Sequence, residues 1–307
     1  MDFKVGGDFE GVTLKVFLKR VGLSSKLVSH LKNVENGITV NGEPATVRRV
    51  LSVGDTVSTL FEDTEGTSAR IKPVKLPIQV LYEDGDLIAV SKPCGMPTHI
   101  SHQHYDDTLA NALAFYFGEP FVFRPVNRLD RDTSGVVIVA KNTRAASILS
   151  KNMVKGQFEK RYIAVVQGEM TVGDEFTVDK PLCRSAKSII IRKVCDISDE
   201  GAQSAVTNVK VIASGGGYSL LGVAPRTGRT HQIRVHLSYI GHPIVGDDLY
   251  GEPSEFIGRQ ALHAAYLSFP SVDGEKLVVT APLPSDICSL LAKVGLSGAD
   301  ISPFLGG

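Results

Sequence analysis

The chain opens with two short helical patterns that are followed by strand patterns. Apolar residues recur at helical spacing over residues 14–21, and a second such pattern over residues 27–31 predicts another helix. An apolar strand pattern at residues 38–40 leads into Asn41-Gly42, a pair typical of a hairpin turn. These elements predict a small independent module at the start of the chain.

The apolar periodicity stops over residues 63–75, which combine charged and hydroxyl side chains with Gly and Pro and therefore predict a linker. Beyond it the apolar signal resumes, and short strand patterns are interspersed with helical ones. The strand patterns cover residues 78–82, 87–90, 136–140, 162–166, 188–194, 205–211 and 218–223. The helical patterns cover residues 109–117, 144–153, 229–240 and 285–294.

The order of these patterns decides the fold class. Strands and helices do not alternate regularly, so a doubly wound parallel sheet is not expected. We predict an α+β fold in which a mixed, largely antiparallel central sheet carries flanking helices, with the small module in front. The predicted boundaries are 1–62 for the module, 63–75 for the linker and 76–307 for the larger domain.

Composition narrows the class of protein. Of the 307 residues, 43% are hydrophobic and 21% are charged, as in ordinary globular proteins, which excludes wholesale disorder. Lys and Arg number 33, and so do Asp and Glu, so no net charge draws the whole molecule to nucleic acid. Nucleic-acid binding would therefore depend on local basic clusters.

Neither a membrane protein nor a cysteine-based framework is expected. The longest stretch without Asp, Glu, Lys or Arg covers residues 211–225 and is too short to cross a bilayer. The start of the chain lacks the apolar run of a secretory signal, and the four cysteines form no CxxC pair. We expect a monomeric, cytoplasmic protein.

A first candidate for chemistry is the stretch at residues 124–141, RPVNRLDRDTSGVVIVAK. Its charged and hydroxyl side chains precede a fully apolar strand and therefore gather at one end of a sheet. Taken alone, the pattern favours a loop with surface ion pairs, because charge clusters are usually solvated.

A second stretch, PRTGRTHQIRVHL at residues 225–237, favours a functional site over a loop with surface ion pairs. Its Thr-Gly-Arg segment precedes a predicted helix, whose free backbone N–H groups suit a phosphate. His231 and Arg234 share one face of that helix, and Arg234 lies beside its apolar face. A partly buried arginine needs a carboxylate, for which Asp130 and Asp132 are both available.

Several segments match one family in order. Residues 127–135 (NRLDRDTSG) resemble the HRLDxxTSG signature of the RluA/RluD family of RNA pseudouridine synthases. Residues 160–168 (KRYIAVVQG) resemble its KxYxAxxxG segment, and residues 228–237 are similar to its GRTHQIRVHL segment. The module at residues 1–62 resembles an S4 RNA-binding domain, which many of these enzymes carry.

The resemblance implies an isomerase that converts uridine to pseudouridine in structured RNA, with ribosomal RNA as first choice of substrate and tRNA as second. The reaction breaks the N1–C1′ bond and joins C5 to C1′ without net gain of electrons or groups. No cofactor and no metal is therefore expected. Asp130 is the implied catalytic carboxylate, which acts on C1′ directly or through a glycal-type intermediate.

The same resemblance implies roles for residues around Asp130. Arg234 would keep the carboxylate ionised, and Tyr162 would stack on the uracil and take the proton from C5. Arg128 would either displace the target base or form a structural salt bridge. Further contacts to RNA or substrate are expected from Arg229, His231, Leu237 and Lys26, with Leu237 in the apolar floor of the site.

One position departs from the family pattern. Asn127 stands where the family usually has histidine. An amide still forms hydrogen bonds but cannot carry a proton charge, so no acid–base or charged phosphate contact is expected from this side chain.

Two other classes of function compete with this interpretation. His102-x-His104-x-Asp106 resembles the HxHxDH zinc motif of metallo-β-lactamase-like hydrolases, although Asp107 stands where the last histidine should be. The other class is a non-catalytic RNA-binding protein with a decayed synthase domain. The intact Asp130, Tyr162 and Arg234 count against it.

Overall fold

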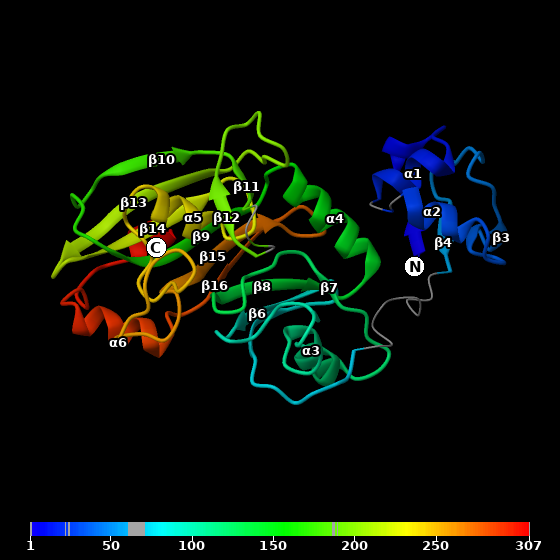
Figure 1. The fold of residues 1–307 in the computed structure, drawn as a ribbon. Helices are drawn as coiled ribbons and strands as arrows, with labels where there is room; N and C mark the ends of the chain where they lie inside the picture. Colours follow the sequence, from blue (N-terminus) through cyan, green and yellow to red (C-terminus); the bar gives the residue numbers. More distant parts are fainter. Residues whose placement is uncertain are drawn as a thin grey trace.

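The computed structural model describes residues 2–21, 23, 25–60, 71–185, 188 and 190–306, without the side chains of Lys26, Leu27 and His30. In the larger domain, ten of the described strands form one sheet (Figure 1). They are β5 (Gln79–Glu83), β6 (Leu87–Lys92), β7 (Arg124–Pro125), β8 (Ser134–Ala140), β9 (Glu159–Gln167), β10 (Glu175–Asp179), β13 (Val206–Gly215), β14 (Tyr218–Pro225), β15 (Leu262–Pro270) and β16 (Lys276–Thr280).

The strand order along this sheet is β10-β13-β14-β9-β15-β8-β6-β5, with β16 paired to β15 and β7 to β8. Among the described pairs, β8 and β15 run parallel and the others antiparallel. The prediction of a mixed, largely antiparallel sheet in an α+β fold is thereby confirmed. A separate two-stranded ribbon joins β11 (Leu182–Arg184) to β12 (Arg192–Val194).

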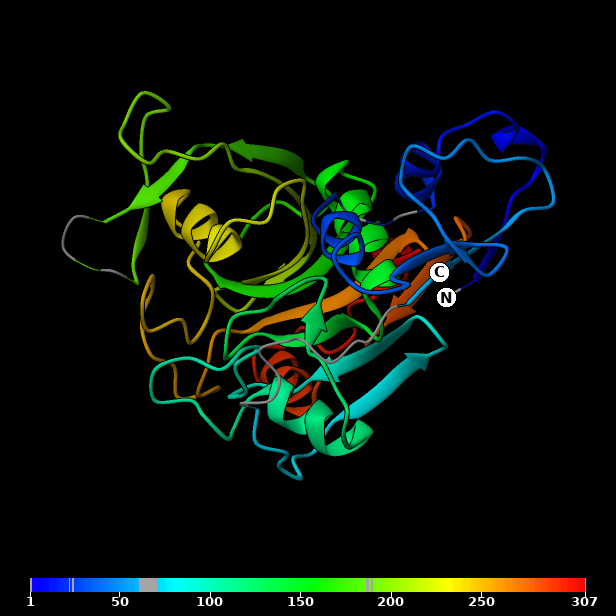
Figure 2. The ribbon, with the colours of Figure 1, turned by 90° about the vertical axis from the view of Figure 1, so that its right-hand side faces the viewer.

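Helices flank both faces of the sheet. They are α3 (Leu109–Phe117), α4 (Thr143–Val154), α5 (Gln232–Tyr239), α6 (Ser285–Lys293) and α7 (Ser302–Leu305). The side chain of Thr108 caps α3 and that of Asn142 caps α4, so each helix starts where a short polar residue satisfies its free N–H groups. Figure 2 shows α5 lying against the curved half of the sheet that contains β13 and β14. No helix in the described part of the chain is long and apolar enough to cross a membrane.

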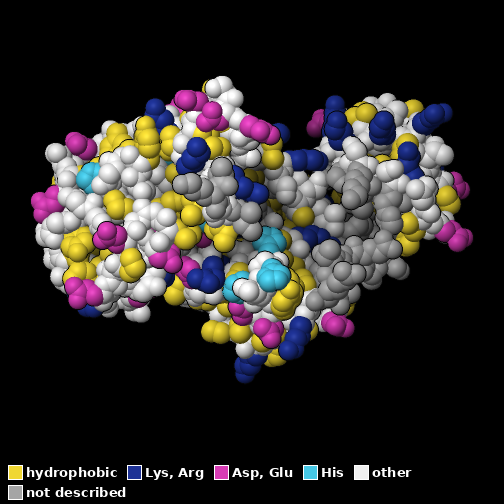
Figure 3. Space-filling model, viewed as in Figure 1, with side chains coloured by type: hydrophobic (Ala, Val, Ile, Leu, Met, Phe, Trp, Pro, Cys, Tyr) yellow, Lys and Arg dark blue, Asp and Glu magenta, His cyan; other side chains and the backbone are white. Residues whose placement is uncertain are grey.

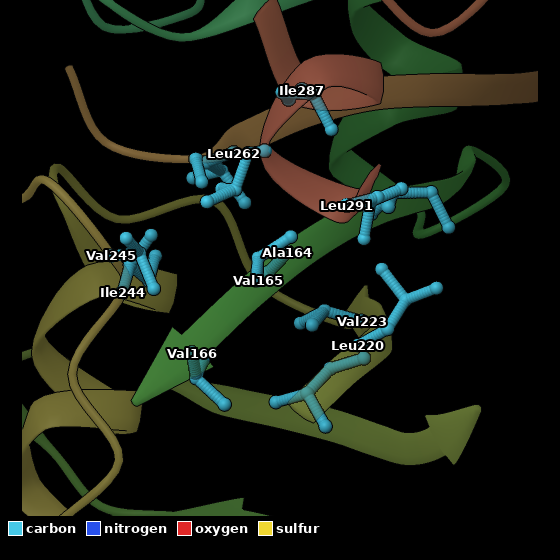
Figure 4. Close-up of a cluster of buried hydrophobic side chains, with 14 of the residues drawn as sticks. Ala164, Val165, Val166, Leu220, Val223, Ile244, Val245, Leu262, Ile287 and Leu291 are labelled. Carbon is cyan, nitrogen blue, oxygen red and sulfur yellow. The ribbon is translucent and has the colours of Figure 1, made fainter. Parts of the chain in front are cut away.

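The core divides according to the alternation of strand side chains. Because β8 is covered on both faces, Val136 and Ile138 pack toward α4, whereas Val137 and Val139 pack toward α3. The largest cluster lies farther along the sheet, where side chains of β9 and β14 meet those of α5 and α6. Figure 4 shows part of that cluster, including Val165 of β9 and Leu291 of α6.

The N-terminal module has a core of its own, and Figure 1 shows it beside the larger domain. Its described elements are β1 (Asp2–Lys4), a 3-10 helix (Gly7–Phe9), α1 (Leu14–Arg20), α2 (Ser25–Leu31), β2 (Ile38–Val40), β3 (Glu43–Pro44) and β4 (Thr56–Thr59). The strands pair in the order β1-β4-β2-β3 around buried residues that include Leu14, Phe17 and Val57.

Several local predictions differ from the structure. Among the described residues of the strand predicted at 188–194, only those of β12 form a strand. β10, β15 and β16 went unpredicted, because β10 and β16 are only five residues long and β15 shows little alternation. Residues 63–70 of the predicted linker lie outside the described residues. Its far end is already fixed to the larger domain, where Val74 donates a backbone hydrogen bond to Asn111 of α3.

The register of the central strands places four residues on one line across the sheet. Gly135 pairs with Ala264, Ala264 with Tyr162, and Tyr162 with Val223. The approach of β15 to β8 requires glycine at 135, because φ is +121° there and a Cβ would lie 2.2 Å from the backbone oxygen of Ala264. The start of β8, the middle of β9 and the end of β14 therefore meet at one level.

Candidate active site

A cleft of about 770 Å³ opens where the start of β8, β9 and the end of β14 meet. Its walls come from the loop between β7 and β8, the end of α4, one face of β9 and the segment that joins β14 to α5. The lining residues are His99, 125–130, Thr133, Met153, Val154, Gly156, Lys160, Tyr162, 225–234 and Leu262. The cleft thus brings together six of the predicted site residues: Arg128, Asp130, Tyr162, Arg229, His231 and Arg234.

The loop that carries Asp130 is held from below by a buried lysine. Lys92 at the end of β6 is fully buried, and its Nζ donates hydrogen bonds to the backbone oxygens of Pro93, Met96 and Arg131, at 2.8, 2.7 and 2.9 Å. Burial lowers the pKa of Lys92 to about 7. The bond to Arg131 ties the peptide directly after Asp130 to the sheet.

A buried threonine fixes the other side of the same loop. The hydroxyl of Thr98 donates to the backbone oxygen of Leu129 at 3.0 Å and accepts from its backbone N–H at 3.3 Å. Leu129 itself packs into the core, and Thr133 N–H closes a turn onto the backbone oxygen of Asp130. The backbone of Asp130 is thereby restrained on both sides while its side chain stays about one-fifth exposed.

Arg234 is held by a carboxylate that the sequence reasoning did not select. Its Nε and Nη2 donate to the two oxygens of Asp247, each at 2.7 Å, and both side chains are buried. Burial alone would lower the pKa of Arg234, but Asp247 and then Asp130 raise it above its ordinary value. Asp132, one of the two partners expected, pairs instead with its neighbour Arg131.

The third nitrogen of Arg234 faces Asp130. Nη1 lies 3.5 Å from Oδ2 of Asp130, and Nε2 of His231 lies 3.9 Å from the same oxygen. A fixed cation at this distance stabilises the ionised carboxylate. Burial lowers the pKa of His231, so its imidazole is neutral at pH 7.

Tyr162 lines the cleft from β9, on the same face of the strand as Lys160. Between them, Arg161 points to the opposite face, where its guanidinium contacts Phe304 and Tyr266. Burial, and after it the negative charge of Asp130, raises the pKa of Tyr162 well above its usual range. At neutral pH its hydroxyl is therefore a neutral phenol.

The lining of the cleft is strongly basic. Of the described residues that line it, Asp130 alone carries a carboxylate, whereas Arg128, Lys160, Arg226, Arg229 and Arg234 carry positive charge. Within the described part of the chain, Arg128 forms no ion pair or hydrogen bond, and its side chain is exposed. The salt-bridge alternative for Arg128 therefore finds no partner among these residues.

Gln232 shapes the segment between β14 and α5. Its side-chain oxygen accepts from the hydroxyl of Thr227 and the N–H of Arg229, and its side-chain nitrogen donates to Val206 and Thr207 on β13. The helix begins at Gln232 rather than at 229 as predicted, because His231 adopts a left-handed backbone with φ of 57°.

Leu237, one of the predicted contact residues, does not reach the cleft. Leu237 is fully buried in the core, one turn beyond Ile233 on α5, so its side chain packs against the sheet. Ile233 and Leu262 supply the apolar lining instead. The side chain of Lys26 lies outside the described residues.

Asn127 has a structural contact in place of a charged one. Its amide nitrogen donates to the backbone oxygen of Val136 at 3.0 Å, and its amide oxygen accepts from the N–H of Ile138 at 2.8 Å. The side chain thus bonds to β8 as a neighbouring strand would, which needs a donor and an acceptor but no charge.

The residues of the alternative zinc motif do not converge. His104 pairs with Asp107 at 2.6 Å, and His102 and Asp106 join no group of ligands within the described ranges. The group of three metal-type ligands that the described residues do form is Cys183, Cys195 and Asp199, on and after the β11–β12 ribbon and outside the cleft lining.

Sequence reasoning missed the residues that hold the site together. Lys92 follows an apolar strand and precedes Pro93, and Asp247 and Tyr250 follow α5 in a glycine-rich turn. A buried lysine can be suspected from its place inside an apolar run, but its backbone acceptors depend on the tertiary fold. The expected pair between Arg234 and Asp130 is present at 3.5 Å, but the closer contact to Asp247 depends on the same packing.

The chain is similar to known proteins over most of its length. A family model described as RNA pseudouridylate synthase matches residues 86–239. The chain is similar to the uncharacterized RNA pseudouridine synthase YjbO of Bacillus subtilis, with 38% identity over 91% of this chain and 98% of that protein. It is 36% identical to ribosomal large subunit pseudouridine synthase D of Vibrio cholerae, over 84% and 83% of the two chains. Among solved structures, human RNA pseudouridylate synthase domain containing 1 superimposes with a TM-score of 0.58 at 27% identity, covering 73% of this chain and 97% of that one.

The role of Lys92 predicts a loss of stability on substitution. Lys92→Met keeps the aliphatic stem but leaves three backbone oxygens without their donor. We therefore expect the free energy of unfolding, measured in urea, to be about 2–4 kcal/mol lower than that of the wild type. The exposed Lys210, paired with Glu175, provides a matched control in Lys210→Met, which should change stability by less than about 1 kcal/mol.

The lowered pKa of Lys92 gives this prediction a pH signature. Because its pKa is about 7 in the folded protein and 10.5 in a free side chain, the unfolded state binds more protons between these values. The unfolding free energy of the wild type should therefore rise with pH from about 7 to about 10 relative to Lys92→Met. Equal stability and parallel pH profiles of the two proteins would contradict this assignment.

Proposed function

Because the chain belongs to the RluA/RluD family of RNA pseudouridine synthases, an isomerase family that converts uridine to pseudouridine in RNA, we propose that this cleft carries out the isomerisation with Asp130 as its catalytic carboxylate. One observation supports this role: among the described residues that line the cleft, Asp130 alone carries a carboxylate, and the other charged ones are basic. We also propose that the enzyme is monomeric.

The geometry around Asp130 suits a reaction at the sugar. Arg234 and His231 both approach Oδ2, and the described side chains place no donor on Oδ1. An ionised carboxylate with one free oxygen can act on C1′ as the N1–C1′ bond breaks, either by attack or through a glycal-type intermediate. The detached uracil then turns and joins C5 to C1′. The proton lost from C5 balances the one gained at N1.

Tyr162 supplies the surface on which the base would rest. Its ring lies beside Ile233 and Leu262 in the cleft, and stacking of a base on an aromatic ring contributes about 1–3 kcal/mol. Since its phenol is neutral, it can take the C5 proton only if its own proton leaves toward another acceptor. We propose that Tyr162 stacks on the uracil and that its oxygen carries this proton transfer.

Arg128 and the other exposed cations would bind the RNA strand around the target. A uridine in folded RNA must leave its stack before its C1′ is accessible, and an arginine without a protein partner can occupy the vacated position. Arg226 and Arg229 stand exposed on the opposite wall, where they can neutralise phosphates. We propose ribosomal RNA as the substrate in the cytoplasm, with tRNA second, on the similarity to a ribosomal large subunit enzyme.

We further propose that residues 1–62 form an S4-like RNA-binding domain. Lys19 and Arg20 end α1 and Lys32 follows α2; all three are exposed and have no ion pair within the described part of the chain. Figure 3 shows Lys and Arg side chains spread over this module. Over residues 1–60, basic residues outnumber acidic ones by 8 to 6, so the contacts would be local rather than driven by net charge.

Replacement of the carboxylate tests the central assignment. Asp130→Asn should reduce single-turnover pseudouridine formation by at least about 10³-fold, because the amide is a poor nucleophile, and should leave RNA affinity within about threefold. Release of tritium from uridine C5 measures the rate. Asp132→Asn, which changes the neighbouring carboxylate paired with Arg131, should retain most of the activity. Turnover by Asp130→Asn near the wild-type rate would refute the assignment.

Removal of one oxygen separates the two roles of Tyr162. Tyr162→Phe keeps the ring, so RNA affinity should stay nearly unchanged while the single-turnover rate falls by about 10²–10⁴-fold. With deuterium at C5 the mutant should show a larger isotope effect than the wild type, because deprotonation has become slow. Tyr218→Phe, on the neighbouring strand and outside the cleft, is the matched control. A fully active Tyr162→Phe would show that another group takes the proton.

The role of the module is tested by its salt dependence. In the full chain, replacing Lys19, Arg20 and Lys32 together by glutamine should weaken RNA binding and reduce the log–log salt slope by about 0.7–0.9 for each phosphate that is no longer neutralised. Replacing the exposed Lys210 and Lys276 by glutamine should leave the slope unchanged. An unaltered slope in the triple variant would exclude these three side chains as phosphate ligands.

A further inference from the structure

Tyr250 lies behind the catalytic carboxylate and contacts both groups that face Asp130. Its ring lies 5.1 Å from the guanidinium carbon of Arg234, and its hydroxyl oxygen lies 2.8 Å from Nδ1 of His231. Those two side chains are the ones that approach Oδ2 of Asp130. Tyr250 is therefore placed to control the surroundings of a carboxylate that it does not touch.

The hydrogen bonds of Tyr250 determine where its own proton lies. The backbone N–H of Arg192, on β12, donates to the phenol oxygen at 2.9 Å. Burial raises the pKa of Tyr250 and lowers that of His231, so the phenol keeps its proton and the imidazole is neutral. The phenol oxygen accepts from Arg192, and its O–H can at the same time donate to Nδ1 of His231.

This bond selects one of the two forms of the neutral imidazole. If Nδ1 accepts the Tyr250 proton, the proton of His231 is on Nε2, the nitrogen 3.9 Å from Asp130 Oδ2. The other tautomer would turn the lone pair of Nε2 toward a carboxylate and would be repelled by it. The left-handed backbone of His231, uncommon for a residue other than glycine, holds the ring between the two partners.

We propose that Tyr250 is a positioning residue that fixes His231 in the tautomer with its proton on Nε2, so that this N–H and Nη1 of Arg234 both face Oδ2 of Asp130, at 3.9 and 3.5 Å, and leave Oδ1 turned toward the ribose. The inference rests on the proposed role of Asp130 at C1′. It assigns His231 to the orientation of the carboxylate rather than to a charge contact with RNA, because a neutral imidazole contributes no charge.

The tautomer is measured directly, without activity. In protein labelled with ¹⁵N-histidine, long-range proton–nitrogen correlations should show His231 protonated on Nε2 in the wild type and as a mixture of tautomers in Tyr250→Phe. This variant keeps the ring beneath Arg234 and removes only the hydroxyl. Tyr239 is an exposed tyrosine at the end of α5, the helix that His231 precedes, and Tyr239→Phe should leave the His231 signals unchanged. A wild-type proton on Nδ1, or no change in Tyr250→Phe, would overturn the proposal.

Kinetics then test whether this orientation matters. Tyr250→Phe should reduce the single-turnover rate about 10–100-fold with RNA affinity unchanged, because the carboxylate is less well oriented. His231→Gln retains an N–H donor near the position of Nε2 and has no tautomers. In that background Tyr250→Phe should therefore have little further effect. Additive losses in the double variant would indicate that Tyr250 acts by another route and would overturn the proposal.

The proposal can fail separately from the role of Asp130. If Asp130→Asn remains active, the carboxylate is not catalytic, and the tautomer measurement still decides whether Tyr250 controls His231. If Asp130→Asn is inactive while Tyr250→Phe turns over at the wild-type rate, the catalytic assignment stands and the positioning role is refuted.

Discussion

The paired hydrogen bonds between Arg234 and Asp247 are the interaction on which the site depends. Burying two charges is costly, and the cost is offset only where geometry and further hydrogen bonds are good. Both conditions hold: two contacts of 2.7 Å join the pair, and Asp247 also accepts from the N–H groups of Leu249 and Tyr250. Because Asp247 accepts from Nε and Nη2 of Arg234, Nη1 is the one guanidinium nitrogen left to face Asp130. Asp130 thus faces a fixed cation through a single contact of 3.5 Å to one of its oxygens.

The sheet supplies the frame that brings this pair to Asp130. The register that aligns Gly135, Ala264, Tyr162 and Val223 makes the Asp130 loop, β9 and the start of α5 converge at one level. The absence of a side chain at Gly135 lets two strands approach. Lys92 of β6 donates to a backbone oxygen of the Asp130 loop, and Gln232 donates to a backbone oxygen of β13. Buried polar groups therefore fix the positions of the side chains that line the cleft, and such fixed charges and dipoles form a preorganised electrostatic site.

Much of this arrangement could be predicted from the sequence, and the exceptions have a common cause. Asp130, Tyr162 and Arg234 were selected because their motifs resemble a family, and the fold class followed from the order of short strand and helix patterns. Leu237 was assigned to the cleft from the same resemblance, and the structure buries it in the core instead, because a motif does not show how deep a side chain lies. Asp247 was passed over because its partner Arg234 lies 13 residues away in the chain, and Lys92 because its contact to the Asp130 loop joins residues 39 apart, which only the tertiary fold brings together. The shortened helix at Gln232 was not predicted either, since the left-handed backbone of His231 leaves no signal in the apolar spacing.

The most direct test of the account is a map of pseudouridine at single-nucleotide resolution in RNA from cells that lack this gene. The account predicts that one or more sites in structured RNA, expected in ribosomal RNA, lose the modification. Those sites should regain it when the wild-type chain is supplied and remain uridine when the supplied chain carries asparagine at 130. An unchanged map in the absence of the gene, or full restoration by the chain with asparagine at 130, would contradict the claim that this cleft forms pseudouridine through Asp130.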